Sequence, residues 1–182
     1  DFKLGRPAEA RARAERLAGE AERRGDQRLR AEALNVLGFV AKSGGDFDGA
    51  EERFATALAL ARARGDRAGE ARFLHNVGLV RYNRGEDASA REVVDRSLEL
   101  ATEIGDPVQV GWAVNTLGLL ALRGQDAPAA IGLFERAVAE GRRGGHREIE
   151  ALSLNNLAMI AHERRELARA RELLTRSLAL LE

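Results

Sequence analysis

The chain has 182 residues, of which 29 are basic and 29 are acidic, so its formal net charge is zero. It contains no cysteine, which excludes a disulfide framework, a thiolate metal site and a thiol nucleophile. A neutral chain argues against general nucleic-acid binding, and no apolar stretch approaches the ~20 residues that span a bilayer.

The chain begins with one helix-like segment, residues 8–24, and then repeats four times with a period of 40 residues. A glycine followed by a polar residue marks each boundary: Gly25-Asp26, Gly65-Asp66, Gly105-Asp106 and Gly145-His146. Each repeat has a small residue after a Leu-x-x-Leu type pattern, at Gly38, Gly78, Gly118 and Ala158. An alanine follows twelve residues later, at Ala50, Ala90, Ala130 and Ala170. Four copies in one register indicate a repeat protein.

Each repeat predicts a hairpin of two helices, because its apolar residues fall three and four positions apart. The predicted hairpins cover residues 27–64, 67–104, 107–144 and 147–182. The boundary glycines suit the left-handed position that ends a helix, and the Asp residues after them can cap the next one. Residues 8–24 match the second helix of a hairpin whose first helix is missing. We therefore predict an all-α fold, with residues 1–182 forming one repeat domain of a larger protein.

A hairpin with Leu-x-x-Gly in its first helix and Ala-x-x-x-Phe in its second resembles the tetratricopeptide repeat. The period of 40 rather than 34 residues is similar to the long-helix variant of kinesin light chains and bacterial regulators. The resemblance implies a right-handed superhelical solenoid of antiparallel hairpins, with a concave face lined by the first helices. It also implies a module for protein–protein interaction, often the sensory or scaffolding arm of a larger signalling or transcription regulator.

The first helices have a face, opposite their core positions, with fewer charges than a solvated face should carry. Apolar residues and the single Trp lie on it, and a row of asparagines runs beside them. Since an amide both donates and accepts hydrogen bonds, such a row can pair with the backbone of an extended peptide. We predict a groove for a peptide or protein partner, formed by Asn35, Phe39, Arg72, His75, Asn76, Leu79, Tyr82, Asn83, Trp112, Asn115, Leu119, Arg123, Asn155, Asn156 and Met159.

Two alternatives remain open for this face. The long helices can instead bury it against neighbouring hairpins, with the asparagines in hydrogen bonds between helices. The whole chain can also be a structural spacer or a self-association element, with a homodimer formed through its terminal helices. The leucine-rich segment 167–182 is the second helix of the last repeat, and we expect it either to pair with another chain or to continue into further repeats of the parent protein.

Chemistry is disfavoured by the residues that it would need. The histidines, His75, His146 and His162, do not share metal-ligand spacing on one helix face. Paired carboxylates such as Glu51-Glu52 lie on outward faces, and there is no phosphate-binding loop or nucleophile elbow. We therefore predict no catalytic residue, metal site or cofactor, no nucleic-acid or membrane partner, and a cytoplasmic location.

Overall fold

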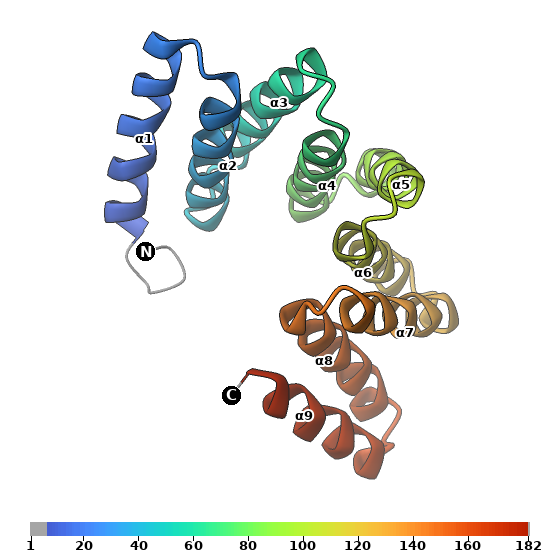
Figure 1. The fold of residues 1–182 in the computed structure, drawn as a ribbon. Coiled ribbons are helices and arrows are strands. Elements are labelled where there is room, and N and C mark those ends of the chain that lie inside the picture. The colour runs from blue at the N-terminus through green and yellow to red at the C-terminus, as the bar shows by residue number, and fades with distance from the viewer. Residues whose placement is uncertain (1–6, 182) are drawn as a thin grey trace. The chain divides into compact units, whose positions relative to one another are not determined.

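The computed structural model describes residues 7–181, and within this range the chain forms nine α-helices and no strand (Figure 1). The all-α prediction is confirmed, and each predicted hairpin contains two helices. The ends of the predicted domain, residues 1–6 and 182, lie outside the described residues. The helices are α1 (Pro7–Arg24), α2 (Gln27–Ser43), α3 (Phe47–Ala63), α4 (Arg67–Arg84), α5 (Asp87–Glu103), α6 (Pro107–Arg123), α7 (Ala127–Arg143), α8 (Arg147–Glu163) and α9 (Leu167–Leu181).

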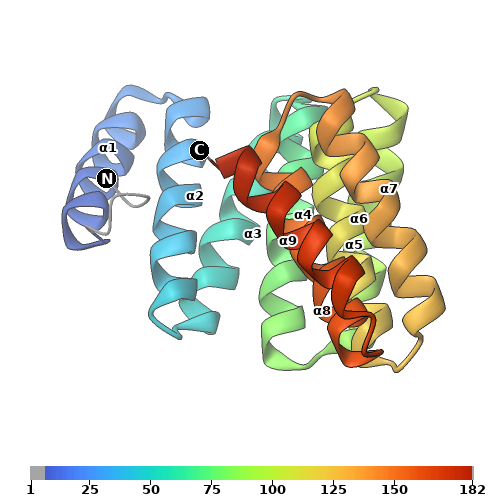
Figure 2. The ribbon, with the colours of Figure 1, turned by 90° about the horizontal axis from the view of Figure 1, so that it is seen from below.

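The chain divides into two compact units, Asp1–Val93 and Val94–Glu182. In the first unit, α1 packs against α2, α2 against α3, and α3 against α4. In the second unit, α6 packs against α7, α7 against α8, and α8 against α9, and α6 also contacts α8. Figure 2 shows α1 beside α2 and α9 beside α8. Whether both units form the single domain expected from the repeat stays a prediction.

The ends of the helices follow the predicted punctuation. The boundary glycines adopt left-handed backbone conformations, with φ values of 67° at Gly25 and 70° at Gly105. The Asp residue after each of these two glycines then caps a helix: an Oδ1 atom accepts a hydrogen bond from the backbone N–H of Leu29 or Gln109. His146 differs, because its side chain makes no capping hydrogen bond to α8. Local backbone conformation and capping therefore set where most hairpins begin.

The cap at the start of α4 predicts a pH dependence of stability. The backbone N–H of Gly69 donates to Asp66, and with the guanidinium of Arg64 it holds the pKa of this carboxyl below its ordinary value of 3.8. A carboxylate with a lower pKa in the folded chain stabilises the fold above its unfolded pKa, and this contribution is lost as the pH falls through the folded value. We expect Asp66→Asn, which keeps a capping oxygen, to reduce the loss of stability between about pH 7 and about pH 2.5.

Urea midpoints of the wild type and of Asp66→Asn at the two pH values measure this difference. Asp126→Asn is a control for the exchange of a carboxylate for an amide at a cap, because Asp126 caps α7 through the same kind of bond from Ala129 N–H. Equal pH-dependent losses in the wild type and Asp66→Asn would contradict the prediction.

The hairpins close where a small residue of the first helix meets a large residue of the second. A Cβ atom on Gly118 would lie 2.6 Å from Cε1 of Phe134, and one on Gly38 would lie 2.5 Å from Cε1 of Phe54. Both phenylalanines are fully buried. The glycines therefore allow a ring to sit against the backbone of the facing helix. This packing fixes which side of each first helix is turned away from its own hairpin.

Candidate partner-binding face

In the first unit, the predicted face belongs to α2 and α4, and polar bonds join the two helices across it. Nδ2 of Asn76 donates to Oδ1 of Asn35 at 2.7 Å. One turn away, the guanidinium of Arg72 pairs with the carboxylate of Glu32 and also lies 4.7 Å from the ring centre of Phe73. These contacts hold the first helices of successive hairpins together.

In the second unit, α6 and α8 repeat the amide contact. Oδ1 of Asn115 accepts one hydrogen bond from Nδ2 of Asn156 at 3.0 Å and another from Oγ of Ser153 at 3.1 Å. Asn115 is only 3% exposed and Ser153 is fully buried, so water does not replace these bonds easily. Four of the predicted asparagines thus form hydrogen bonds between helices, as in the alternative that the sequence left open: Asn35, Asn76, Asn115 and Asn156.

The predicted groove residues differ in exposure, so they do not form a row that faces solvent throughout. The buried ones are His75, Asn76 and Asn115. The half-buried ones are Asn35, Phe39, Arg72, Leu79, Tyr82, Trp112, Leu119 and Asn156. The exposed ones are Asn83, Arg123, Asn155 and Met159. The difference has a physical reason: the first helices lie close enough for their amides to bond to each other instead of to solvent.

Two aromatic residues of the face are partly covered by neighbours. Phe39 packs edge-on against the core residue Phe54, with ring centres 5.3 Å apart. The Nζ atom of Lys42 lies 5.4 Å from the ring centre of Phe39. Burial lowers the pKa of Lys42. Trp112 meets the ring of His146 edge-on at 5.6 Å. Both rings keep a half-exposed surface, and each is held in place from one side.

The most exposed large apolar side chains of the first helices lie on α8. Met159 is 42% exposed and Leu152 is 39% exposed, and the exposed amide of Asn155 lies between them along the helix. On α2, Val36 is similarly exposed at 38%. An amide one helical turn from each of two apolar side chains is a pattern that suits contact with a partner backbone and its side chains.

One structural residue was missed by the sequence interpretation. Ser153 donates a hydrogen bond to Asn115 and lies 38 residues after it, close to one repeat length, and this spacing is the sequence feature that could have indicated the contact.

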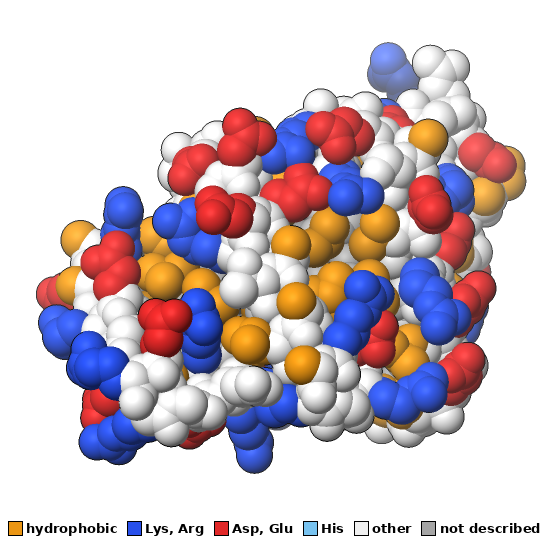
Figure 3. Space-filling model, turned by 90° about the horizontal axis from the view of Figure 1, so that it is seen from above, with side chains coloured by type: hydrophobic (Ala, Val, Ile, Leu, Met, Phe, Trp, Pro, Cys, Tyr) orange, Lys and Arg blue, Asp and Glu red, His pale blue; other side chains and the backbone are white. Residues whose placement is uncertain are grey.

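Away from the candidate face, acidic and basic side chains are interspersed on the surface, as Figure 3 shows. Residues 7–181 contain no group of His, Asp and Glu that would hold a metal ion, and none of their helices has the length and apolar character needed to cross a membrane.

The hairpins α2–α3 and α6–α7 repeat the same glycine-to-phenylalanine contact, which is typical of a helical-repeat protein. Similar proteins indicate the kind of repeat. The family described as Tetratricopeptide repeat matches residues 151–182, which cover most of α8 and all of α9. The predicted resemblance to this repeat is confirmed, and the fold is that of a tetratricopeptide-type helical solenoid. No curated protein matches the sequence.

Solved structures with the same fold cover nearly the whole chain. BtubC (BKLC) from P. vanneervenii is 22% identical, with a TM-score of 0.76, over 96% of this chain and 73% of that one. A putative kinesin light chain from Podosopora anserina, with nearly identical TPR-like repeats, is 16% identical, with a TM-score of 0.66, over 98% and 88%. PilF from Pseudomonas aeruginosa is 22% identical, with a TM-score of 0.59, over 96% and 82%. At these identities, the likeness concerns the fold.

Proposed function

We propose that this chain is a protein-interaction module that binds a peptide or a segment of a partner protein on the face of its first helices. The observation that carries the proposal is the exposed group on α8, where Met159 and Leu152 flank the amide of Asn155. Tetratricopeptide-type arrays are generally protein–protein interaction modules, which supports the same conclusion. The chain would then serve as the sensory or scaffolding arm of a larger bacterial signalling or transcription regulator in the cytoplasm, without enzymatic activity or a cofactor.

The chemistry of the exposed residues suggests what is bound. Asn155 offers a donor and an acceptor to an extended backbone, and Met159 adapts its flexible side chain to apolar residues of the partner. Arg123 adds an exposed cation at the end of α6. The buried Asn115 contributes indirectly, because its bonds fix the position of α8 relative to α6. The ligand class is therefore an extended peptide segment with small or medium apolar side chains.

A second candidate function is a structural spacer or a self-association element. The hydrogen bonds between Asn35 and Asn76, and between Asn115 and Asn156, favour it, because they use amides that a peptide would otherwise need. In that case, the face of the first helices has no separate ligand, and the exposed residues of α8 tolerate polar replacement without loss of any binding.

Panning a random peptide library on the intact chain tests the two functions. We expect selected peptides to change the emission of Trp112, the only indole, and Met159→Asp to weaken their binding by about tenfold or more, since it places a charge in an apolar contact. Glu52→Ala, an exposed change on α3, is the matched control and should bind like the wild type. Peptides that bind Met159→Asp as tightly as the wild type would favour the structural-spacer function. A library that yields no binding peptide would favour it as well.

A further inference from the structure

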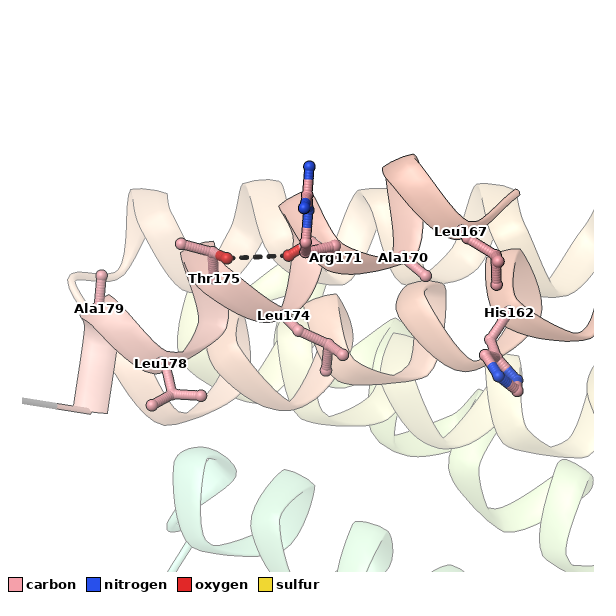
Figure 4. A pocket seen from close by; sticks show the side chains of 8 residues that line it. All are labelled: His162, Leu167, Ala170, Arg171, Leu174, Thr175, Leu178 and Ala179. Atoms are coloured by element: carbon pink, nitrogen blue, oxygen red, sulfur yellow. Dashed lines mark hydrogen bonds between the residues drawn. The ribbon is translucent and has the colours of Figure 1, made fainter. Parts of the chain in front are cut away.

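A cavity on α9 is explained by the packing of the repeat. It measures about 590 Å³ and is lined by His162 of α8 and by leucines of α9 such as Leu174 (Figure 4). The equivalent residue of α7, Phe134, is buried in one cluster with Leu154 and Leu157 of α8. The face of α9 in Figure 4 is thus the face that a second helix turns towards a following hairpin.

A cavity inside the first unit has a different origin. It measures about 460 Å³ and lies between α1, α2 and the start of α3. Its lining includes the apolar residues Leu37, Val40 and Ala41 of α2. Two guanidinium groups also line it, those of Arg11 on α1 and Arg53 on α3. A cavity of this size, with apolar residues and a few charged groups, has the properties of a small-molecule site.

The equivalent place in the next repeat carries large side chains instead of small ones. Forty residues after Ala41 and Gly44, which line the cavity, the chain has Arg81 and Arg84. Arg81 binds the carboxylate of Glu51 at 2.9 Å, and Arg84 binds the same carboxylate at 2.5 Å. An ion-pair network therefore uses the positions at which the first hairpin has small residues.

The equivalent place in the last hairpin is almost closed. Its cavity measures only about 10 Å³ and is lined by Ile131 and Arg164, at the positions of Arg11 and Gly44. The lining residues come from α7, α8, α9 and the turn between the last two, and no residue before α7 is among them. Three consecutive helices thus form this place in the repeat. For the cavity of the first unit these helices are α1, α2 and α3, so its size follows from its own small residues.

The lining of the first cavity has a net positive charge. Its charged residues are two arginines, Arg11 and Arg53, and one acid, Asp46. The acid is already engaged, because its Oδ1 atom accepts the backbone N–H of Gly49 at 2.9 Å and caps α3. Arg53 donates to the backbone carbonyl of Gly49, which is a neutral partner. Arg11 donates through Nε to the exposed carboxylate of Glu15 at 2.9 Å.

Arg53 distinguishes this hairpin from the other three. Its equivalents, 40, 80 and 120 positions later, are all apolar: Val93, Leu133 and Leu173. Arg11 is less distinctive, because Arg91 has its position in the third copy. A guanidinium group forms short, paired hydrogen bonds with a carboxylate. A cation that replaces an apolar residue beside an apolar cavity therefore favours an anionic ligand with an apolar body.

We propose that this cavity binds a small carboxylic acid with an apolar chain. The carboxylate pairs with Arg53, and Arg11 adds to the positive charge around it. The apolar chain of the acid lies against Leu37 and Val40. The cavity shares no residue with the predicted peptide groove, so this site does not depend on the peptide-binding function proposed above.

Titration of the intact, nitrogen-15-labelled chain with hexanoate, followed by two-dimensional NMR, tests the proposal. We expect saturable shifts of the backbone amides of Leu37, Val40 and Gly44. Hexanoate should bind at least about tenfold more tightly than 1-hexanol or hexylammonium, which have the same chain without the carboxylate, and its advantage should shrink as salt screens the charges. Equal affinities for the three probes, or no saturable shift with hexanoate, would overturn the proposal.

A single substitution tests the role of the distinctive arginine. Arg53→Leu introduces the residue of the third and fourth copies. It should weaken hexanoate binding about tenfold and leave the affinity for 1-hexanol unchanged, since it removes only the charge contact. Arg16→Leu is the matched control, because Arg16 is exposed on α1 and does not line the cavity. Hexanoate that binds Arg53→Leu as tightly as the wild type would contradict the proposed site.

A filled cavity locates the binding. A variant with Arg11→Glu, Ala41→Arg and Gly44→Arg carries the ion-pair residues of the next repeat, and the φ of −85° at Gly44 suits an arginine. We expect it to keep the far-ultraviolet circular dichroism of the wild type and to lose hexanoate binding. Retained binding would place hexanoate elsewhere and overturn the proposal. So would tighter binding by the variant with Phe2→Ser and Leu4→Ser, since the segment before α1 would then be the occupant.

Discussion

Phe134→Ala is expected to lower the free energy of unfolding by about 3–5 kcal/mol, the largest effect of any single change considered for this chain. The ring is fully buried between α6, α7 and α8, and Gly118 leaves no side chain that could move into the space. The cavity would therefore stay open, and its cost adds to the lost transfer free energy of the ring. Urea unfolding followed by circular dichroism measures the difference.

The repeat supplies a matched control for this substitution. Leu174 has the position of Phe134 in the last hairpin but is 46% exposed among the described residues. Leu174→Ala should cost about 1 kcal/mol or less, since much of its side chain is already in water. Similar losses from the two substitutions would contradict the prediction, because they would mean that Leu174 is as well buried in solution as Phe134.

The hairpins follow from the sequence because their signals are local. A glycine that ends a helix and an Asp that caps the next one act within a few residues, as at Gly105 and Asp106. Apolar spacing then assigns the inner side of each helix, whereas the contact of Gly118 with Phe134 was not predicted from the sequence. These features need no knowledge of how one hairpin is placed against the next.

The candidate face was harder to predict, because it depends on the rotation between successive hairpins. Asn35 and Asn76 are 41 residues apart, one more than the repeat, and so are Asn115 and Asn156. One extra residue turns a side chain by about 100° around a helix, which directs the second amide of each pair towards the preceding first helix. The spacing was present in the sequence, but its meaning required the distance between the two helices.

Asn115→Ala is expected to lower the free energy of unfolding by roughly 1–3 kcal/mol, because it leaves the buried hydroxyl of Ser153 and the half-buried amide of Asn156 without their acceptor. Oδ1 of Asn115 accepts from both Ser153 and Asn156, and the hydroxyl of Ser153 is fully buried. Asn155→Ala, on the exposed side of α8, should stay within about 0.5 kcal/mol. The two asparagines looked equivalent in the sequence, and the structure separates them into a residue that holds the helices together and a residue available to a partner.

A double-mutant cycle with Ser153→Ala distinguishes an orphaned donor from a general loss of packing. If the cost of Asn115→Ala comes from the unpaired hydroxyl, removing that hydroxyl should recover part of it, and the double variant should be more stable than the sum of the two changes predicts by about 0.5 kcal/mol or more. Strict additivity would mean that Asn115 and Ser153 do not interact in solution. The structural role of Asn115 would then rest on the hydrogen bond from Asn156 alone.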